Sequence, residues 1–109
     1  MSPTSSSTNC ADKLKLLADT TRLAVLESLL ERPKRVGELM ALLGVEQSLM
    51  SHHLALLREA GLVDAKREGK SVLYQLASHV ESATSGKSLD LGCCQLSFPS
   101  PRKISKRTK

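Results

Sequence analysis

Three cysteines are the residues of this 109-residue chain with the most distinctive chemistry. Cys10 lies near one end of the sequence, and Cys93 and Cys94 are adjacent near the other. Thiolates bind soft, thiophilic ions, and thiols also form disulfides or react with persulfides. The cysteines are therefore candidates for a ligand site or a thiol switch, and an odd number does not make a closed set of disulfides.

A second group of candidate residues combines hydrogen-bonding side chains with positive charge. Between Gln47 and Ala60 the apolar residues repeat at helical spacing, while short or polar side chains share another face, and a basic hairpin follows. Such side chains contact base edges and phosphates, so the segment predicts a DNA interface, with Gln47 as the best candidate for a base contact. The predicted DNA-binding residues are Gln47, Ser48, Ser51, His52, Lys66, Arg67 and Lys70.

Three helices should precede this segment. We expect residues 1–9 to be a disordered polar leader, followed by a short first helix. Asp19 is a good N-cap for the second helix, and Pro33 marks its end. The third helix should end at Gly44, because a left-handed cap suits glycine.

The fourth helix and the hairpin complete the predicted DNA-facing unit. Met50, Leu54 and Leu57 share one helix face, which should pack the fourth helix against the second and third. His53 should be packed beneath the same helix. Two strand-like runs follow, and Gly69 supplies the positive φ that a tight turn between them needs.

The last part of the chain contains weaker signals. A fifth helix should begin at about Ser78, and Gly86 should cut it short. From Phe98 onward we expect a disordered tail. The predicted fold class is therefore mostly α with a small β-hairpin.

The net charge of +5 is unevenly distributed along the sequence. Five of the 16 Lys and Arg residues lie among the last eight residues, which leaves 11 to balance 11 Asp and Glu. DNA binding must therefore rest on local clusters, of which Lys66, Arg67 and Lys70 form the clearest and Lys34 with Arg35 a second.

The length leaves room for one domain with roughly 80 packed residues. A core of that size is marginal alone, so a helical homodimer is expected. The chain has no run of 18 apolar residues and no export signal, which predicts a cytoplasmic protein without membrane partners. In that compartment the three cysteines should be reduced ligands or sensors rather than structural disulfides.

Four segments resemble the ArsR/SmtB family of bacterial metal-responsive repressors. They read Leu-Ala-Asp-Thr-Thr-Arg-Leu at 17–23, Gly-Glu-Leu at 37–39, Ser-His-His-Leu-Ala-Leu-Leu-Arg-Glu-Ala-Gly-Leu-Val at 51–63 and Arg-Glu-Gly-Lys at 67–70. The resemblance implies a winged helix-turn-helix homodimer, paired through its first and last helices, that blocks a promoter until an inducer binds. Residues 10–92 would form the DNA-binding and dimerisation domain, and residues 93–109 would carry the cysteine pair and the disordered basic tail.

The resemblance also allows the inducer sites of the family to be checked. The thiolate pair that follows Glu-Leu in the third helix is missing, because Met40-Ala41-Leu42 stands there. The Asp-x-His pair of zinc sensors is missing from the start of the expected last helix, which offers Ser78-His79-Val80 instead.

Cys10, Cys93 and Cys94 remain as metal ligands, and trivalent arsenic or antimony binds three sulfurs in a pyramid. We therefore expect As(III) or Sb(III) as the inducer and no required cofactor. If the first helix of one subunit packs beside the last helix of the other, Cys10 would approach Cys93 and Cys94 of the partner chain. The dimer would then bind an imperfect inverted repeat in double-stranded DNA.

Two alternatives stay open. The same fold could respond to oxidant or persulfide through its cysteines as a thiol switch. It could also be a protein-interaction module that never binds DNA, which the neutral charge of the folded part favours. No catalytic constellation and no phosphate-binding loop occur in the sequence, so we expect no enzyme.

Overall fold

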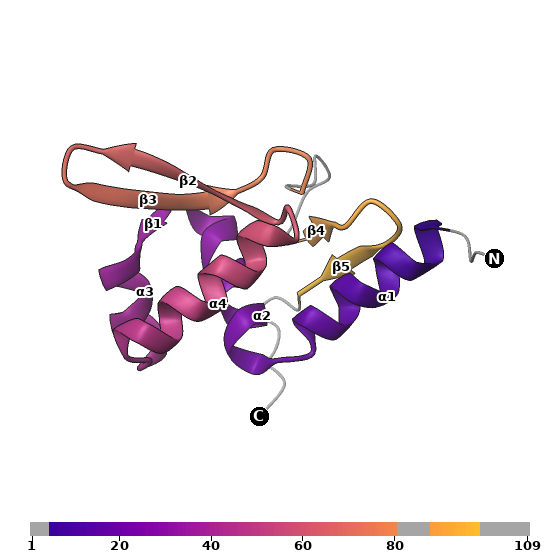
Figure 1. The fold of residues 1–109 in the computed structure, drawn as a ribbon, viewed down its shortest axis with the longest axis horizontal. Helices are drawn as coiled ribbons and strands as arrows, with labels where there is room; N and C mark the ends of the chain where they lie inside the picture. The colour runs from indigo at the N-terminus through magenta and orange to yellow at the C-terminus, as the bar shows by residue number, and fades with distance from the viewer. Residues whose placement is uncertain (1–4, 81–87, 99–109) are drawn as a thin grey trace, which may run out of the picture.

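The computed structural model describes residues 5–80 and 88–98, with side chains from Cys10 onward (Figure 1). Its elements are α1 (Ser5–Leu17), α2 (Thr20–Glu31), β1 (Lys34–Arg35), α3 (Val36–Leu43), α4 (Gln47–Glu59), β2 (Val63–Glu68), β3 (Ser71–Leu76), β4 (Ser88–Asp90) and β5 (Gln95–Ser97). Four helices with a long β-hairpin confirm the mostly α class with a winged helix-turn-helix architecture. None of the described helices is both long and apolar enough to cross a membrane.

Local signals set the ends of the middle helices. The Asp19 carboxylate accepts a hydrogen bond from the backbone N–H of Arg22 at 3.0 Å, as expected of an N-cap. α2 ends at Glu31, two residues before Pro33, and α3 is capped by Gly44 with a φ of 65°. These three predictions are confirmed.

α1 is longer than the sequence pattern predicted. It begins at Ser5, inside the leader that we expected to be disordered up to residue 9, while residues 1–4 lie outside the described part. Leu17 is buried, whereas Leu14 is 46% exposed. The helix thus packs against the core through Leu17 and half-buried Leu16, while Leu14 lies at the surface.

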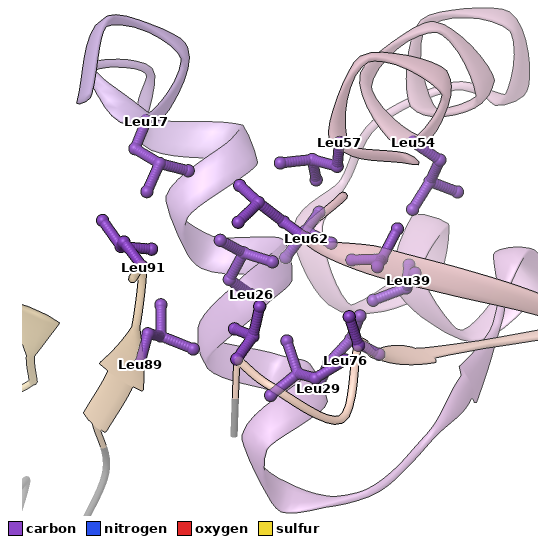
Figure 2. Close-up of a cluster of buried hydrophobic side chains, with 14 of the residues drawn as sticks. Leu17, Leu26, Leu29, Leu39, Leu54, Leu57, Leu62, Leu76, Leu89 and Leu91 are labelled. Carbon is purple, nitrogen blue, oxygen red and sulfur yellow. The ribbon is translucent and has the colours of Figure 1, made fainter. Parts of the chain in front are cut away.

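A single apolar core joins the helices to both hairpins (Figure 2). Leu26 of α2 and Leu39 of α3 are fully buried, and so are Met50 and Leu57 of α4. The predicted packing face of α4 is therefore confirmed. Burying a side chain of this size is worth about 1.5–3 kcal/mol, so the face holds α4 firmly against α2 and α3.

The wing is a three-stranded antiparallel sheet with the order β1-β3-β2. Val63 pairs with Leu76 at its base, and Glu68 pairs with Ser71 at its tip. Gly69 turns the chain with a φ of 61°, as the sequence predicted. The short β1 pairs with β3 and so connects the wing to the start of α3.

The predicted fifth helix is wrong at its start, which is the part of it that the structure describes. Residues 78–80 form a turn, residues 81–87 lie outside the described part, and β4 and β5 form an antiparallel hairpin beside α1 (Figure 1). Leu89 and Leu91 are both buried, with half-buried Asp90 between them, and this alternation is the period of a strand. The strand Gln95–Ser97 ends directly before Phe98, where the disordered tail was expected to begin, and residues 99–109 of that tail lie outside the described part.

Candidate functional site

The three cysteines meet at one place in a single chain. Their sulfur atoms all lie within 4.8 Å of one another. Cys10 forms a disulfide with Cys93, and its Sγ lies 3.5 Å from the Sγ of Cys94, which is free and exposed. The prediction that these residues form one cluster is thus supported by geometry.

Two expectations about the cluster differ from the structure of the single chain. We expected the cysteines to meet across a dimer, but the β4–β5 hairpin folds back along α1 and brings Cys93 and Cys94 to Cys10 of the same chain. We also expected three reduced thiols, whereas Cys10 and Cys93 are bonded. Their Cα atoms are 5.9 Å apart, which is within the usual range for a disulfide.

The turn that carries the cysteine pair is shaped by its own sequence. The Asp90 carboxylate accepts a hydrogen bond from the backbone N–H of Gly92 at 2.9 Å, and Gly92 has a φ of 94°. The N–H of Leu91 donates to the carbonyl of Cys94 at 2.9 Å and closes the turn. The signal for this turn was Asp-x-Gly directly before the cysteines, which our sequence reasoning missed.

α1 contacts this turn at a second point, one helical turn after Cys10. The ammonium of Lys13 donates to the carbonyl oxygen of Leu91 at 3.1 Å. Because Cys10 and Lys13 are three residues apart on a helix, they share the face toward the hairpin. The cluster is therefore held between a helix and a turn by both a covalent and a polar contact.

All of the residues predicted to bind DNA lie at the surface. On α4, the predicted residues Gln47, Ser48, Ser51 and His52 are exposed near the helix start, as is Leu49. The three predicted wing residues, Lys66, Arg67 and Lys70, are exposed along β2 and the tip of the hairpin. The helix and the wing thus present the predicted polar and basic side chains to solvent.

Arg35 fixes the wing relative to the helices. It lies just before α3, and its guanidinium donates to the Glu68 carboxylate at 2.9 Å and to the Ser71 hydroxyl at 3.1 Å. Both partners belong to the tip of the wing. Arg35 therefore orients the tip, and its ion pair with Glu68 reduces the positive charge that it offers to a phosphate.

Lys34 does not belong to the DNA-facing charge, so the second basic cluster was partly wrong. Its side chain is only 2% exposed, and its ammonium donates to the carbonyl of Ser28 at 2.7 Å and to the Glu31 carboxylate at 3.2 Å. Pairing of β1 with β3 turns this side chain under the C-terminal end of α2. A cation at a helix C-terminus is stabilised by the helix dipole.

His53 is buried beneath α4, as predicted, and it has a partner that the sequence did not reveal. Its Nδ1 lies 3.1 Å from Nη1 of Arg22 on α2. Burial lowers the pKa of His53 below its ordinary value, although the nearby Asp19 carboxylate opposes the shift. The hydrogen bond that Asp19 accepts from the backbone of Arg22 in turn lowers the pKa of that carboxyl group.

Known proteins resemble the middle part of this chain. Residues 19–65 match the family described as bacterial regulatory protein, arsR family. HTH-type transcriptional repressor SmtB of Mycobacterium tuberculosis H37Rv is 44% identical over 66 residues, which are 61% of this chain and 49% of that protein. The chain spans 60% of the length of the first curated relatives.

Solved structures confirm the similarity in three dimensions. HlyU from Vibrio cholerae N16961 superposes with a TM-score of 0.65 at 39% identity, over 69% of this chain and 82% of that chain. A homodimeric winged helix-turn-helix DNA-binding domain from Mycobacterium bovis gives a TM-score of 0.63 at 29% identity, over 71% and 73% of the two chains. The family match over residues 19–65 contains all of α4, whereas the wing residues Lys66, Arg67 and Lys70 follow directly after it.

Proposed function

Because this chain belongs to the ArsR family of bacterial regulatory proteins, we propose that it is a transcriptional repressor released from operator DNA by As(III) or Sb(III). The observation that carries the choice of inducer is the cluster of three cysteine sulfurs within 4.8 Å. The structure brings the sulfurs together from two elements that are far apart in sequence. A packing role for exposed Cys94 would not require this convergence.

The chemistry of the cluster suits a pyramidal As(III) centre. When arsenite, As(OH)3, reacts with three thiols, three As–S bonds form and three water molecules leave, without any change of oxidation state. The cluster contains no histidine or carboxylate group, and thiolate ligands select soft ions over hard ones. The reaction requires that the Cys10–Cys93 disulfide first be reduced by two electrons, as a cellular thiol reductant does.

The proposed readout is operator binding by a homodimer. Gln47 at the start of α4 would contact base edges, Ser48, Ser51 and His52 would contact bases or phosphates, and the wing residues Lys66, Arg67 and Lys70 would bind phosphates. Two recognition helices about 34 Å apart would match an imperfect inverted repeat. Support for a dimer comes from the homodimeric description of the Mycobacterium bovis domain.

A thiol switch is the second candidate, and the Cys10–Cys93 disulfide favours it. An oxidant of the peroxide or disulfide class would accept the two electrons, and a sulfur–sulfur bond would then connect α1 to the hairpin turn. As(III) would connect the same two residues through arsenic. The oxidant and As(III) would therefore both link α1 to the hairpin turn. They differ in that the first requires oxidation of the thiols and the second requires reduced thiols.

One titration separates these candidates. The full-length protein is reduced, and its binding to an operator selected from random duplexes is measured by fluorescence anisotropy while sodium arsenite is added. Release by arsenite without oxidant supports the metalloid sensor, whereas release by diamide alone, reversed by dithiothreitol, supports the thiol switch. Absence of salt-sensitive binding to any duplex would instead support a protein-interaction module, because phosphate contacts weaken with rising salt.

Cysteine variants define the ligand set. X-ray absorption of the arsenite complex should give three sulfur neighbours for the natural protein and two for Cys10→Ser. Cys94→Ser should also give two, although it keeps the pair that forms the disulfide. If arsenic still has three sulfur neighbours in the complex with Cys10→Ser, Cys10 is not a ligand.

A further inference from the structure

The side chain of Arg22 joins three helices at one point. Its Nε donates to the carbonyl of Leu16 near the end of α1 at 2.8 Å, and its Nη1 lies 3.1 Å from Nδ1 of His53 on α4. Its own backbone N–H is held by the N-cap of α2, Asp19. The guanidinium thus connects the helix that carries Cys10 with the helix that carries the DNA-facing side chains.

The polarity of the Arg22–His53 contact is set by the chemistry of the two groups. A guanidinium has only donors, so Nδ1 of His53 must be the acceptor and the ring must be neutral, with its proton on Nε2. His53 is 6% exposed. A hydrogen bond from a charged donor in such a site is stronger and more directional than one at the surface, which makes it suited to hold α4 in one orientation.

Direct packing between α1 and α4 is incomplete beside this contact. A hollow of about 400 Å³ lies between them, lined by Asp12, Lys13 and Leu16 of α1 and by Leu56, Glu59 and Ala60 of the α4 end. A shift of α1 would therefore be poorly transmitted across the hollow by side-chain packing. The Arg22 bonds connect the two helices next to this hollow, since Leu16 both lines it and accepts from Arg22.

At its other end, α1 is held by the thiol cluster. Cys10 and Leu16 are six residues apart on one continuous helix, which places them about 9 Å apart along its axis. A helix of this length moves as a rigid body. Any change in how Cys10 is bound to the hairpin turn therefore reaches the carbonyl of Leu16 that Arg22 holds.

We propose that Arg22 is a positioning residue that couples the state of the thiol cluster to the orientation of α4. The inference rests on the proposed function. Binding of As(III) to Cys10, Cys93 and Cys94 repositions α1, the Leu16 carbonyl moves with it, and Arg22 changes its contact with His53. Because His52 is next to His53 on α4 and is exposed, this change reaches the DNA-facing surface directly.

The test measures coupling separately from binding. For each reduced variant, the operator Kd is determined with and without saturating sodium arsenite, and arsenite binding is followed independently by thiolate ultraviolet absorption. A coupling of about 5- to 150-fold is typical of such regulators. We expect His53→Leu, which removes the acceptor, to bind arsenite and operator but to bring the ratio of the two Kd values close to one.

A conservative variant and a matched control sharpen the result. His53→Asn places an amide oxygen near the position of Nδ1 and should keep the ratio of the natural protein. Arg32→Gln removes an exposed arginine that pairs with Glu38 beyond the other end of α2, so its ratio should also be unchanged.

The outcomes distinguish this inference from the proposed function. If the natural protein itself shows no response to arsenite, the proposed function fails. If the natural protein responds and His53→Leu keeps the full ratio, coupling through Arg22 is refuted. If circular dichroism shows that His53→Leu does not fold, Arg22→Lys takes its place in the test, because one ammonium cannot hold both Leu16 and His53 as the guanidinium does. An unchanged ratio of Kd values in Arg22→Lys refutes the coupling, and a ratio near one supports it.

Discussion

Replacing Cys93 by serine should lower the stability of the oxidised protein by about 2–4 kcal/mol, the usual range for a disulfide. The bond joins positions separated by 83 residues, so it closes most of the folded chain into one loop. The chain-entropy relation gives about 4.5 kcal/mol for a loop of this size, which is an upper value because structure that remains in the unfolded state reduces the gain.

Urea unfolding at a fixed protein concentration measures this difference. With a slope of about 1 kcal/mol/M, the midpoint of Cys93→Ser should lie about 2–4 M below that of the oxidised natural protein. Cys94→Ser is the matched control, because it removes an equally small group from the same turn and leaves the Cys10–Cys93 bond in place. Dithiothreitol should bring the natural protein and Cys94→Ser down toward the midpoint of Cys93→Ser.

The reasoning would be refuted if Cys93→Ser and Cys94→Ser unfolded at the same urea concentration under oxidising conditions. It would also fail if reduction left the natural protein unchanged. Arsenite added to the reduced protein should restore part of the lost stability, because a ligand that binds only the folded state raises its stability by mass action. Mg(II) at the same concentration serves as the comparison with a hard ion, which prefers oxygen ligands, and should restore less.

Three further predictions concern the helices and the wing. Burial lowers the pKa of His53 in the folded protein, so the unfolded chain binds a proton more readily as the pH falls. The free energy of unfolding, measured with urea, should be retained above about pH 6.5 and decrease below it. His53→Asn should make the free energy of unfolding depend less on pH in this range. Lys66→Gln should reduce the slope of log K against log salt concentration by about 0.9 in operator binding, because one phosphate contact is lost. Lys34→Met, at a buried position, should leave that slope unchanged. It should lower the free energy of unfolding measured with urea by about 1–3 kcal/mol. Arg35→Gln should speed hydrogen exchange at the wing tip near Glu68 and weaken operator binding, and equal exchange rates would show that the ion pair does not order the wing.

Predictions that depended on a few neighbouring residues agree with the structure. Asp19 caps α2, Gly44 ends α3 and Gly69 turns the wing because each effect acts within one turn of backbone. The packing face of α4 was equally visible, since helical periodicity alone places Met50, Leu54 and Leu57 on one side.

Predictions that depended on distant contacts were less successful. Nothing near Lys34 in the sequence shows that β1 pairs with β3 and turns the ammonium under α2. The contact of Arg22 with His53 joins residues 31 positions apart and follows only from the packing of α2 against α4. The fifth helix was expected to begin at about Ser78, but residues 78–80 form a turn. The alternation of buried Leu89 and Leu91 is the period of a strand, and the sequence reading did not use it.

The sequence by itself determined the cysteine inventory, the basic wing and the polar face of α4, because composition and local periodicity suffice for these. Only the tertiary structure decided that Cys10 meets Cys93 and Cys94 within one chain. The reason is that the position of the cysteine pair depends on how β4 and β5 fold back on α1. Burial of Leu89 and Leu91 settles this, in a core whose other buried members lie between Leu17 and Val80. Chemical identity is a property of single residues, whereas a three-sulfur site is a property of their packing.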